Sequence, residues 1–207
     1  VSRRLELVNY SAAHGSLVIE DDFENEFVYL QKPTPSLFGL AGGQNVVYLG
    51  TFSRLLLPSI RISFMVLPPE LSALYRKKAD QYNQTASKAE QIALCQFIRD
   101  GHLAAQTRKL KRLYSVKLKA LRSAVREVFG KDSQIQTGAA GTSLALTLST
   151  TLTWQELQKK AQTNGLRLQL LREAPGKITL ILSCSSMPVA DFVPACKLLK
   201  NISQIQN

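Results

Sequence analysis

The sequence is poor in the residues that build metal sites, disulfide frameworks and histidine-based catalytic centres. It has 2 histidines, 3 cysteines and 1 tryptophan among 207 residues. The cysteines are odd in number, widely spaced and in apolar settings, which indicates buried thiols in a reducing compartment and hence a cytoplasmic protein. His14 and His102 lack the spacing of a Ser–His–Asp or Cys–His site, and no ligand cluster indicates a metal.

Long hydrophobic runs are also missing. No apolar segment approaches the roughly 20 residues of a membrane-spanning helix, and the start of the chain lacks the hydrophobic stretch of a signal peptide. A hydrophobic content of 45% and a mean hydropathy of −0.04 are typical of a globular soluble protein. The length suits one domain, or one and a half with a shared core. Because the first residue is Val1 rather than methionine, we expect the chain to be part of a longer protein.

The chain as a whole has a net charge of +11. This positive charge is concentrated in one part of the chain. Residues 1–75 carry 5 basic and 7 acidic side chains, residues 76–131 carry 14 and 4, and residues 132–207 carry 7 and 4. Between residues 103 and 128, apolar residues recur every three to four positions, as on the buried face of a helix. Cations fill many of the other positions: Arg108, Lys109, Lys111, Arg112, Lys119, Arg122 and Arg126.

Two interpretations of these cations stay open. They form the solvated face of a half-buried helix, or they bind DNA or an acidic neighbouring domain. If the chain is a DNA-binding module that acts through this helix, its binding to duplex should weaken steeply with salt. Aromatic residues are not interleaved with the cations, which argues against a platform for single-stranded nucleic acid. No helix-turn-helix pattern is evident.

Helical and strand patterns alternate along the chain without internal repeats. Helices are expected over residues 3–14, 70–82, 87–100, 102–129, 154–164 and 187–201. Buried strands are expected over 16–20, 45–50 and 60–67, and further strands over 143–149 and 177–184. Thr153 and Glu156 have the spacing of a capping box. The prediction is an α/β fold, in which residues 1–104 form part of a large domain with a parallel or mixed sheet and helices. Residues 105–207 form a smaller α+β domain.

Charged residues directly follow two of the predicted strands. The first strand runs into Glu20, Asp21 and Asp22, and the second runs into Gly50-Thr-Phe-Ser-Arg54. The carboxyl ends of parallel strands meet at one edge of a sheet, where charged cofactors bind. On its own, the acidic run would also suit a divalent cation or a solvated strand end.

Four successive segments resemble a known family. They read HGSLVIEDDFENEFVY, PTPSLFGL, VVYLGTFSRLLLPSIRISFMVLPPEL and QFIRDGHLAAQTRKLKRLY. In this order and at this spacing they resemble the aminotransferase-like domain of MocR-type transcription regulators of the GntR family. The resemblance implies a fold-type I transferase fold of the kind that binds pyridoxal 5'-phosphate (PLP). It matches the C-terminal portion only, with part of the large domain followed by the small α+β domain.

The resemblance also assigns roles to five positions. Asp21 matches the aspartate that pairs with the pyridinium nitrogen of PLP. Ser53 and Arg61 match positions that contact the cofactor phosphate. Phe23 stands where the family commonly has a tyrosine, and Arg54 stands where it has the Schiff-base lysine.

These two departures imply a site without transaminase activity. A Schiff base needs an amine that can lose its proton, whereas a guanidinium, with a pKa above about 12, stays charged. Reversible binding of PLP or another anion through Arg54 and Arg61 remains open, with Asp21 expected to be buried opposite them. The glycine-rich turn and the stacking aromatic residue that complete the family's cofactor pocket have no counterpart in this sequence.

For the protein as a whole, the resemblance implies an effector-sensing and dimerisation domain of a cytoplasmic transcription regulator. Such regulators are homodimers that sense a small amino-acid-like effector and bind DNA through a winged-helix domain, which is absent from this sequence. Candidates for binding an effector carboxylate, by charge alone, are Arg167, Arg172 and Lys177. The alternative is a PLP-dependent class I/II aminotransferase that acts on amino acids through another lysine, such as Lys32.

Overall fold

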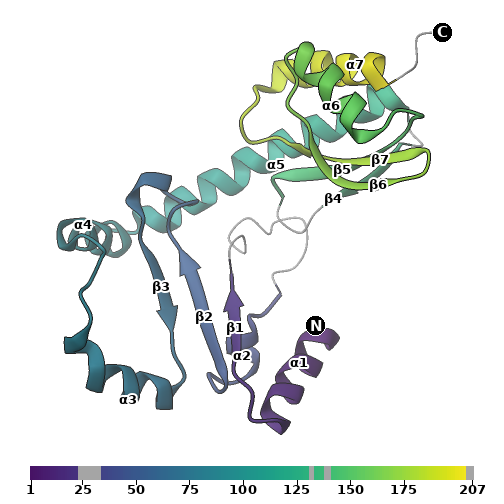
Figure 1. Cartoon of the computed structure of the whole chain (residues 1–207). Coiled ribbons are helices and arrows are strands. Elements are labelled where there is room, and N and C mark those ends of the chain that lie inside the picture. Colours follow the sequence, from purple (N-terminus) through teal and green to yellow (C-terminus); the bar gives the residue numbers. More distant parts are fainter. Residues whose placement is uncertain (23–33, 131–132, 138–140, 204–207) are drawn as a thin grey trace. The chain divides into compact units, whose positions relative to one another are not determined.

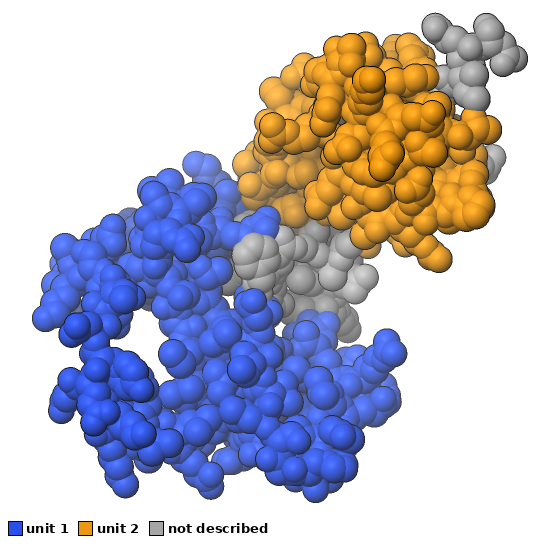
Figure 2. All heavy atoms as spheres, in the orientation of Figure 1, with its two compact units in different colours: residues 1–26, 32–110 blue, residues 27–31, 111–207 orange. Residues whose placement is uncertain are grey.

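The computed structural model describes residues 1–22, 34–130, 133–137 and 141–203. They form two compact units, the first ending at Leu110 and the second beginning at Lys111 (Figure 2). The division falls inside one long helix, α5 (His102–Phe129), whose predicted range of 102–129 is confirmed. The domain boundary expected after residue 104 stays a prediction.

The first unit is built around a three-stranded sheet (Figure 1). Strands β1 (Val18–Asp21) and β2 (Val46–Thr51) are parallel, and β3 (Ser63–Val66) runs antiparallel to β2. The helical segments of this unit besides α5 are α1 (Ser2–Ala13), α2 (Leu37–Leu40), η2 (Pro58–Ile60), α3 (Pro69–Lys78), η3 (Ala79–Gln81) and α4 (Lys88–Arg99).

The core of the first unit is small. Among the described residues, its buried hydrophobic side chains are Leu37, Val46, Val47, Leu55, Ile62 and Leu94. Strand β3 was expected to be buried, and this prediction is wrong, because all four of its residues are exposed. An apolar run is buried on both faces only if a second layer covers each face, and the described residues leave Phe64, Met65 and Val66 uncovered.

The second unit is an antiparallel sheet with helices packed on one face (Figure 1). Its strand order is β4 (Gln134–Thr137), β5 (Ser143–Ser149), β7 (Lys177–Ser183) and β6 (Gln169–Ala174). The helical segments that accompany it are the second half of α5, α6 (Trp154–Thr163), η4 (Val189–Asp191) and α7 (Phe192–Ser203). The strand predicted at 143–149 is confirmed, whereas β4 and β6 were not predicted.

A continuous hydrophobic core holds the second unit together. Strand β5 alternates in burial, so Leu144, Leu146 and Leu148 point inward. They pack in one cluster with side chains of α5 and α7, among them Leu121 and Phe192. Full burial of one such side chain contributes roughly 1.5–3 kcal/mol. This unit is therefore an α+β layer with its own core.

Within the described ranges, no helix combines the length and the apolar character that crossing a bilayer requires.

Candidate functional site

The ends of two parallel strands lie at one edge of the first unit's sheet, and three of the predicted site residues lie there. Asp21 ends β1 and pairs in register with Leu49, two residues before Thr51 ends β2. A cavity of 1390 Å³ opens at this edge and along β3, and its lining includes Asp21, Thr51, Ser53 and Arg61. The structure thus brings together three of the five predicted positions, Asp21, Ser53 and Arg61.

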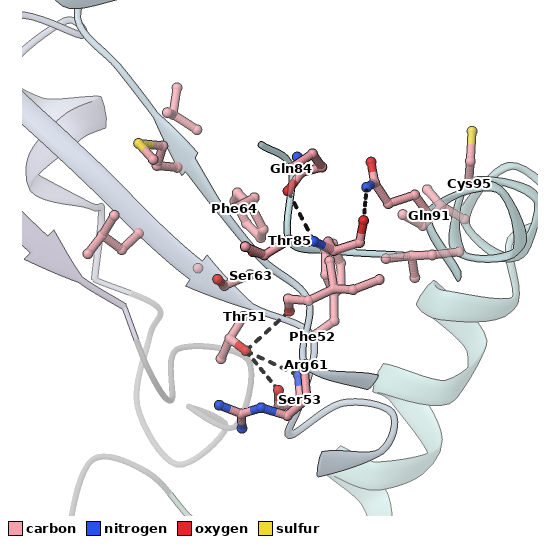
Figure 3. A pocket seen from close by; sticks show the side chains of 18 of the residues that line it. Thr51, Phe52, Ser53, Arg61, Ser63, Phe64, Gln84, Thr85, Gln91 and Cys95 are labelled. Atoms are coloured by element: carbon pink, nitrogen blue, oxygen red, sulfur yellow. Dashed lines mark hydrogen bonds between the residues drawn. The ribbon is translucent and has the colours of Figure 1, made fainter. Parts of the chain in front are cut away.

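The polar end of this cavity is a turn that follows β2 (Figure 3). The Ser53 amide donates to Thr51 Oγ1 at 3.2 Å, and the hydroxyls of the two residues lie 3.2 Å apart. Thr51 Oγ1 also lies 3.4 Å from the Ile62 carbonyl, which joins the turn to the segment that contains Arg61. Two hydroxyls and a guanidinium suit the oxygens of a phosphate or carboxylate, because guanidinium groups form paired, charge-assisted hydrogen bonds with such anions.

Arg61 owes its place in the site to an unusual backbone conformation. It caps the short helix η2 with φ at +48°, in the left-handed region that non-glycine residues rarely adopt. The neighbouring Ile62 is buried, whereas the Arg61 side chain is exposed and lies on the same side of the turn as Ser53 (Figure 3). The conformation costs of order 1 kcal/mol or more, so it is consistent with a functional position.

Arg54 follows Ser53 in the same turn and is partly buried. It is not one of the residues that line the cavity. Phe23, the fifth predicted site residue, lies outside the described residues, as does Lys32. The roles that the resemblance assigns to these positions stay predictions.

Asp21 is exposed, and the expectation of a buried carboxylate is wrong for this chain. Side chains alternate between the two faces of a strand, so Asp21 lies on the face opposite Glu20. Ile19, which shares the face of Asp21, is 65% exposed. No layer among the described residues covers this face, and Asp21 therefore meets solvent.

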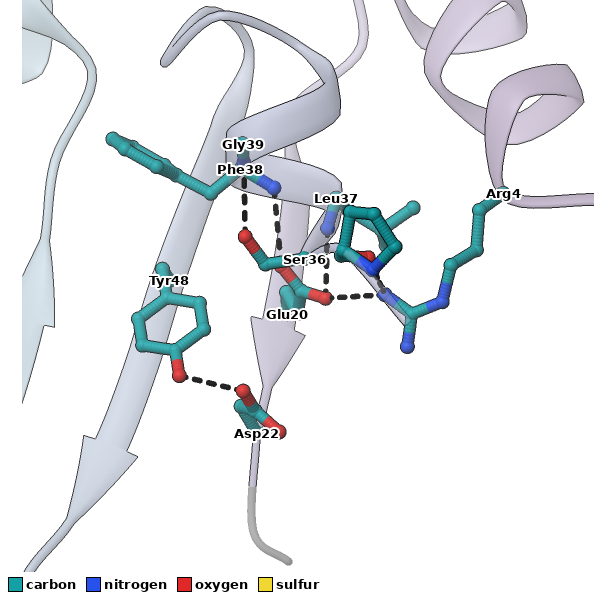
Figure 4. Close-up of polar contacts among 9 residues, drawn as sticks. Arg4, Glu20, Asp22, Ser36, Leu37, Phe38, Gly39 and Tyr48 are labelled. Atoms are coloured by element: carbon teal, nitrogen blue, oxygen red, sulfur yellow. Dashed lines mark hydrogen bonds and ion pairs between the residues drawn. The ribbon is translucent and has the colours of Figure 1, made fainter. Parts of the chain in front are cut away.

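The other two acids of the run make structural contacts (Figure 4). Glu20 is buried and accepts hydrogen bonds from the amides of Leu37 and Phe38, at 2.9 and 3.1 Å. It also forms an ion pair with Arg4 at 2.8 Å. Asp22 accepts from the hydroxyl of Tyr48. The run therefore does not converge on a cation, and no cluster of metal-binding side chains occurs among the described residues.

Aromatic residues that sequence reasoning missed pack beside the turn. The ring of Phe64 lies 5.3 Å from that of Phe52 and 6.2 Å from that of Tyr48, measured between centroids. Phe64 pairs with Gly50 across the two strands and covers it so closely that a Cβ there would lie 2.4 Å from the ring. An aromatic residue opposite a strand glycine is a known pairing, but the register that brings them together was not readable from either residue alone.

Solved structures share this architecture. The chain superposes on the multiple substrate aminotransferase of Thermococcus profundus with a TM-score of 0.79, at 22% identity, covering 98% of this chain and 51% of that one. For LysN, the α-aminoadipate aminotransferase of Thermus thermophilus, the TM-score is 0.76 at 24% identity, covering 96% and 53%. That structure contains N-(5'-phosphopyridoxyl)-L-leucine. The chain therefore has the fold of fold-type I PLP aminotransferases.

Sequence relatives narrow the class further. The chain is 32% identical to the HTH-type transcriptional regulator YdeL of Bacillus subtilis, over 97% of this chain and 44% of the regulator. It is 30% identical to the probable rhizopine catabolism regulatory protein MocR of Rhizobium meliloti, over 81% and 34%. It is an aminotransferase-like chain homologous to MocR/GntR-type regulators, and it spans less than half of their length. No family model matches the chain.

Proposed function

We propose that this chain forms part of the effector-sensing and dimerisation domain of a GntR/MocR-type transcription regulator, and that it lacks transaminase activity. One observation supports the proposed lack of transaminase activity. The turn that follows β2 reads Thr51-Phe-Ser-Arg54, and arginine occupies the position that the resemblance assigns to the Schiff-base lysine. Homology to HTH-type regulators over nearly the whole chain supports the proposed role in a transcription regulator.

The chemistry of Arg54 accounts for the loss of activity. Bound PLP serves aminotransferases as an electron sink after it has bonded covalently to an amine. A guanidinium keeps its proton and delocalises its charge, so Arg54 neither attacks a carbonyl nor moves a proton near neutral pH. Its charge instead favours an anion that is held without a covalent bond.

Ser53, Thr51 and Arg61 fit the phosphate of such a ligand. Their hydroxyl and guanidinium groups gather at one end of the cavity, and Phe64 borders the same space with an apolar ring. Asp21 would attract the positive part of an amino-acid-like or pyridinium ligand. PLP itself, or an amino-acid-like effector with an anionic group, matches this set. The regulator's cytoplasmic location, homodimeric state and DNA-binding winged helix complete the proposal.

The test compares the wild-type chain with Arg54→Lys after incubation with PLP and reduction with borohydride. In the variant we expect a reduced adduct at position 54, located by mass spectrometry. Before reduction we expect an absorbance band at about 400 nm that the wild type lacks. Arg61→Lys, which introduces a lysine elsewhere in the same cavity, is the matched control and should not form this adduct. Failure of Arg54→Lys to form it would overturn the assignment of position 54.

A second candidate is a PLP-dependent class I/II aminotransferase that acts on amino acids. The observation that favours it is a relative: the 2-aminoadipate transaminase of Thermus thermophilus is 28% identical over 82% of this chain and 41% of that enzyme. This candidate needs another lysine, such as Lys32. A stoichiometric adduct at Lys32 in the wild type, together with turnover of an amino-group donor with 2-oxoglutarate, would establish the aminotransferase. The same result would contradict the proposal that the chain lacks transaminase activity.

A further inference from the structure

We propose that the exposed face of α5 in the second unit binds the phosphate backbone of duplex DNA. Four cations define this face, which we call the basic stripe: Arg112, Lys119, Arg122 and Arg126. All four are exposed. The cavity lined by Asp21, Ser53 and Arg61 belongs to the first unit. The proposal is therefore independent of whether a ligand binds near Arg54.

Helical geometry aligns the stripe. At 3.6 residues per turn and 1.5 Å per residue, the four positions lie within an arc of about 80° and span about 21 Å along the axis. Leu118, Leu121 and Val125 of the same helix are buried in the core. The core thereby fixes which face of α5 is presented to solvent, and the four cations lie along one side of the helix.

Among the residues that the structure describes, no carboxylate pairs with the stripe. Glu127 is the single acidic residue of α5, and none of the four stripe residues makes an ion pair with a carboxylate in the described parts of the chain. Lys119 and Arg122 are three residues apart, and Arg122 and Arg126 are four apart, spacings at which like charges destabilise a helix. A polyanion would relieve this repulsion.

Other cations of the second unit contrast with the stripe because they stabilise the fold. Lys117 donates to the Ser185 carbonyl at 2.9 Å. Lys200 donates to the Val128 carbonyl at 2.8 Å, which caps the end of α5. The stripe cations make no such contacts with the described residues. Their charges therefore form no hydrogen bond or ion pair there that would stabilise this part of the fold.

Duplex DNA matches the stripe in charge density and in length. It carries one phosphate charge per roughly 1.7 Å of axis, so a length of about 21 Å carries about 12 charges on its two strands. Three of the four cations are arginines, which bind phosphate oxygens in pairs. The homologous regulators are HTH-type transcriptional regulators, which favours DNA over an acidic protein as the polyanion. Because phosphate contacts carry no base information, we expect this binding to be independent of sequence.

The experiment measures binding of a labelled duplex of about 20 base pairs by fluorescence anisotropy as a function of salt. Four phosphate contacts predict a slope of about −3.6 in log affinity against log salt, or roughly a 150-fold loss of affinity between 50 and 200 mM. The stripe variant, in which all four residues become glutamine, should lose most of this slope. A scrambled duplex should bind the wild type equally well.

The matched control removes the same charge elsewhere on the second unit. Lys159, Arg172, Lys177 and Lys197 are exposed, and changing all four to glutamine should leave the slope nearly unchanged. Circular dichroism checks that both variants are folded. Equal loss in both variants, or no binding by the wild type at low salt, would overturn the proposal. Stripe-dependent binding of polyglutamate without binding of duplex would overturn it in favour of an acidic protein partner.

Discussion

Glu20, Asp21 and Asp22 are adjacent in the chain and have three different environments. Glu20 is buried against the start of α2, Asp22 contacts the Tyr48 hydroxyl, and Asp21 is exposed at the cavity edge. The alternation of a β-strand explains the split, since neighbours point to opposite faces. The acidic run therefore contains two residues with structural contacts, Glu20 and Asp22, and one residue, Asp21, at the edge of the cavity.

Replacing Glu20 with alanine should destabilise the first unit by about 2 kcal/mol, because the amides of Leu37 and Phe38 and the Arg4 side chain lose their acceptor. Hydrogen exchange at Leu37 and Phe38 should accelerate accordingly. Asp21→Ala, one residue away on the exposed face, is the control and should change stability by less than about 0.5 kcal/mol. Similar exchange rates in the two variants would contradict the structural role of Glu20.

Cysteine reactivity should separate one thiol from the other two. Cys184 and Cys196 are buried, but Cys95 is exposed, which corrects the expectation that all three are buried. Burial raises the pKa of both buried thiols, to about 11 for Cys196, where the charge of Glu127 adds to the effect. At pH 8 a thiol reagent should label Cys95 rapidly and the other two only after denaturation. Rapid labelling of two or three thiols in the native protein would contradict this structure.

Helix α6 shows how an element of the second unit is begun by local sequence alone. The Thr153 side chain accepts from the Glu156 amide, and the Glu156 carboxylate accepts from the Thr153 amide at 2.8 Å. This reciprocal pair is the capping box that the spacing predicted, and the prediction is confirmed. Leu157 and Ala161 then bury the helix against the core.

Thr153→Ala should lower the stability of the second unit by about 1 kcal/mol, because an unpaired amide remains at the helix start. The neighbouring Thr151 is exposed and makes no hydrogen bond recorded among the described residues, so Thr151→Ala is the control. Thermal unfolding followed by circular dichroism at about 222 nm, in the helix band, measures the stability of both variants. A melting temperature equal to the wild type's for Thr153→Ala would show that the cap has no energetic role.

The same cap predicts a pH dependence. The hydrogen bonds from Thr153 hold the pKa of Glu156 below its ordinary value of 4.5. A lowered folded-state pKa stabilises the fold above the ordinary value, and this contribution is lost as the pH falls through the folded-state pKa. Glu156→Gln should therefore show a shallower loss of stability below pH 4.5 than the wild type. An unchanged acid profile would exclude this contribution.

The two units of the chain differ most in their cores. In the described residues, one cluster of 17 buried hydrophobic residues organises the second unit, whereas six such residues serve the first. The first unit also leaves apolar side chains of β1 and β3 exposed, including Ile19 and Met65. Since apolar burial is the main favourable term in folding, the second unit should be the more stable of the two.

A fragment of residues 111–207 should therefore fold alone with a cooperative thermal transition, and residues 1–110 should not. Limited proteolysis of the whole chain should leave the second unit intact longest, because cleavage follows local opening. Circular dichroism and one-dimensional proton spectra of the two fragments measure the difference. A cooperative transition in residues 1–110 would show that the small core of the first unit suffices.

Much of what is local in this protein was determined by its sequence. The 3.6-residue periodicity predicted α5, and the capping spacing predicted the start of α6; the strand β5 was also predicted within its observed bounds. The chemical character of Arg54 and the density of positive charge on α5 also follow from residue identity alone. These features depend on neighbours within about one helical turn or a few strand positions, so they need no knowledge of distant residues.

Only the tertiary structure decided which of these residues meet. It placed Asp21 in solvent and Glu20 beneath α2, exposed Cys95, and paired Gly50 with Phe64. It also paired the unpredicted strand β4 with β5, and β6 with β7. Register and burial depend on contacts between segments far apart in the chain, and a one-residue shift would invert each strand's faces. For that reason the sequence predicts, through the family resemblance, a cation in place of the Schiff-base lysine, whereas the fold showed that Ser53, Thr51 and Arg61 form the polar end of the cavity.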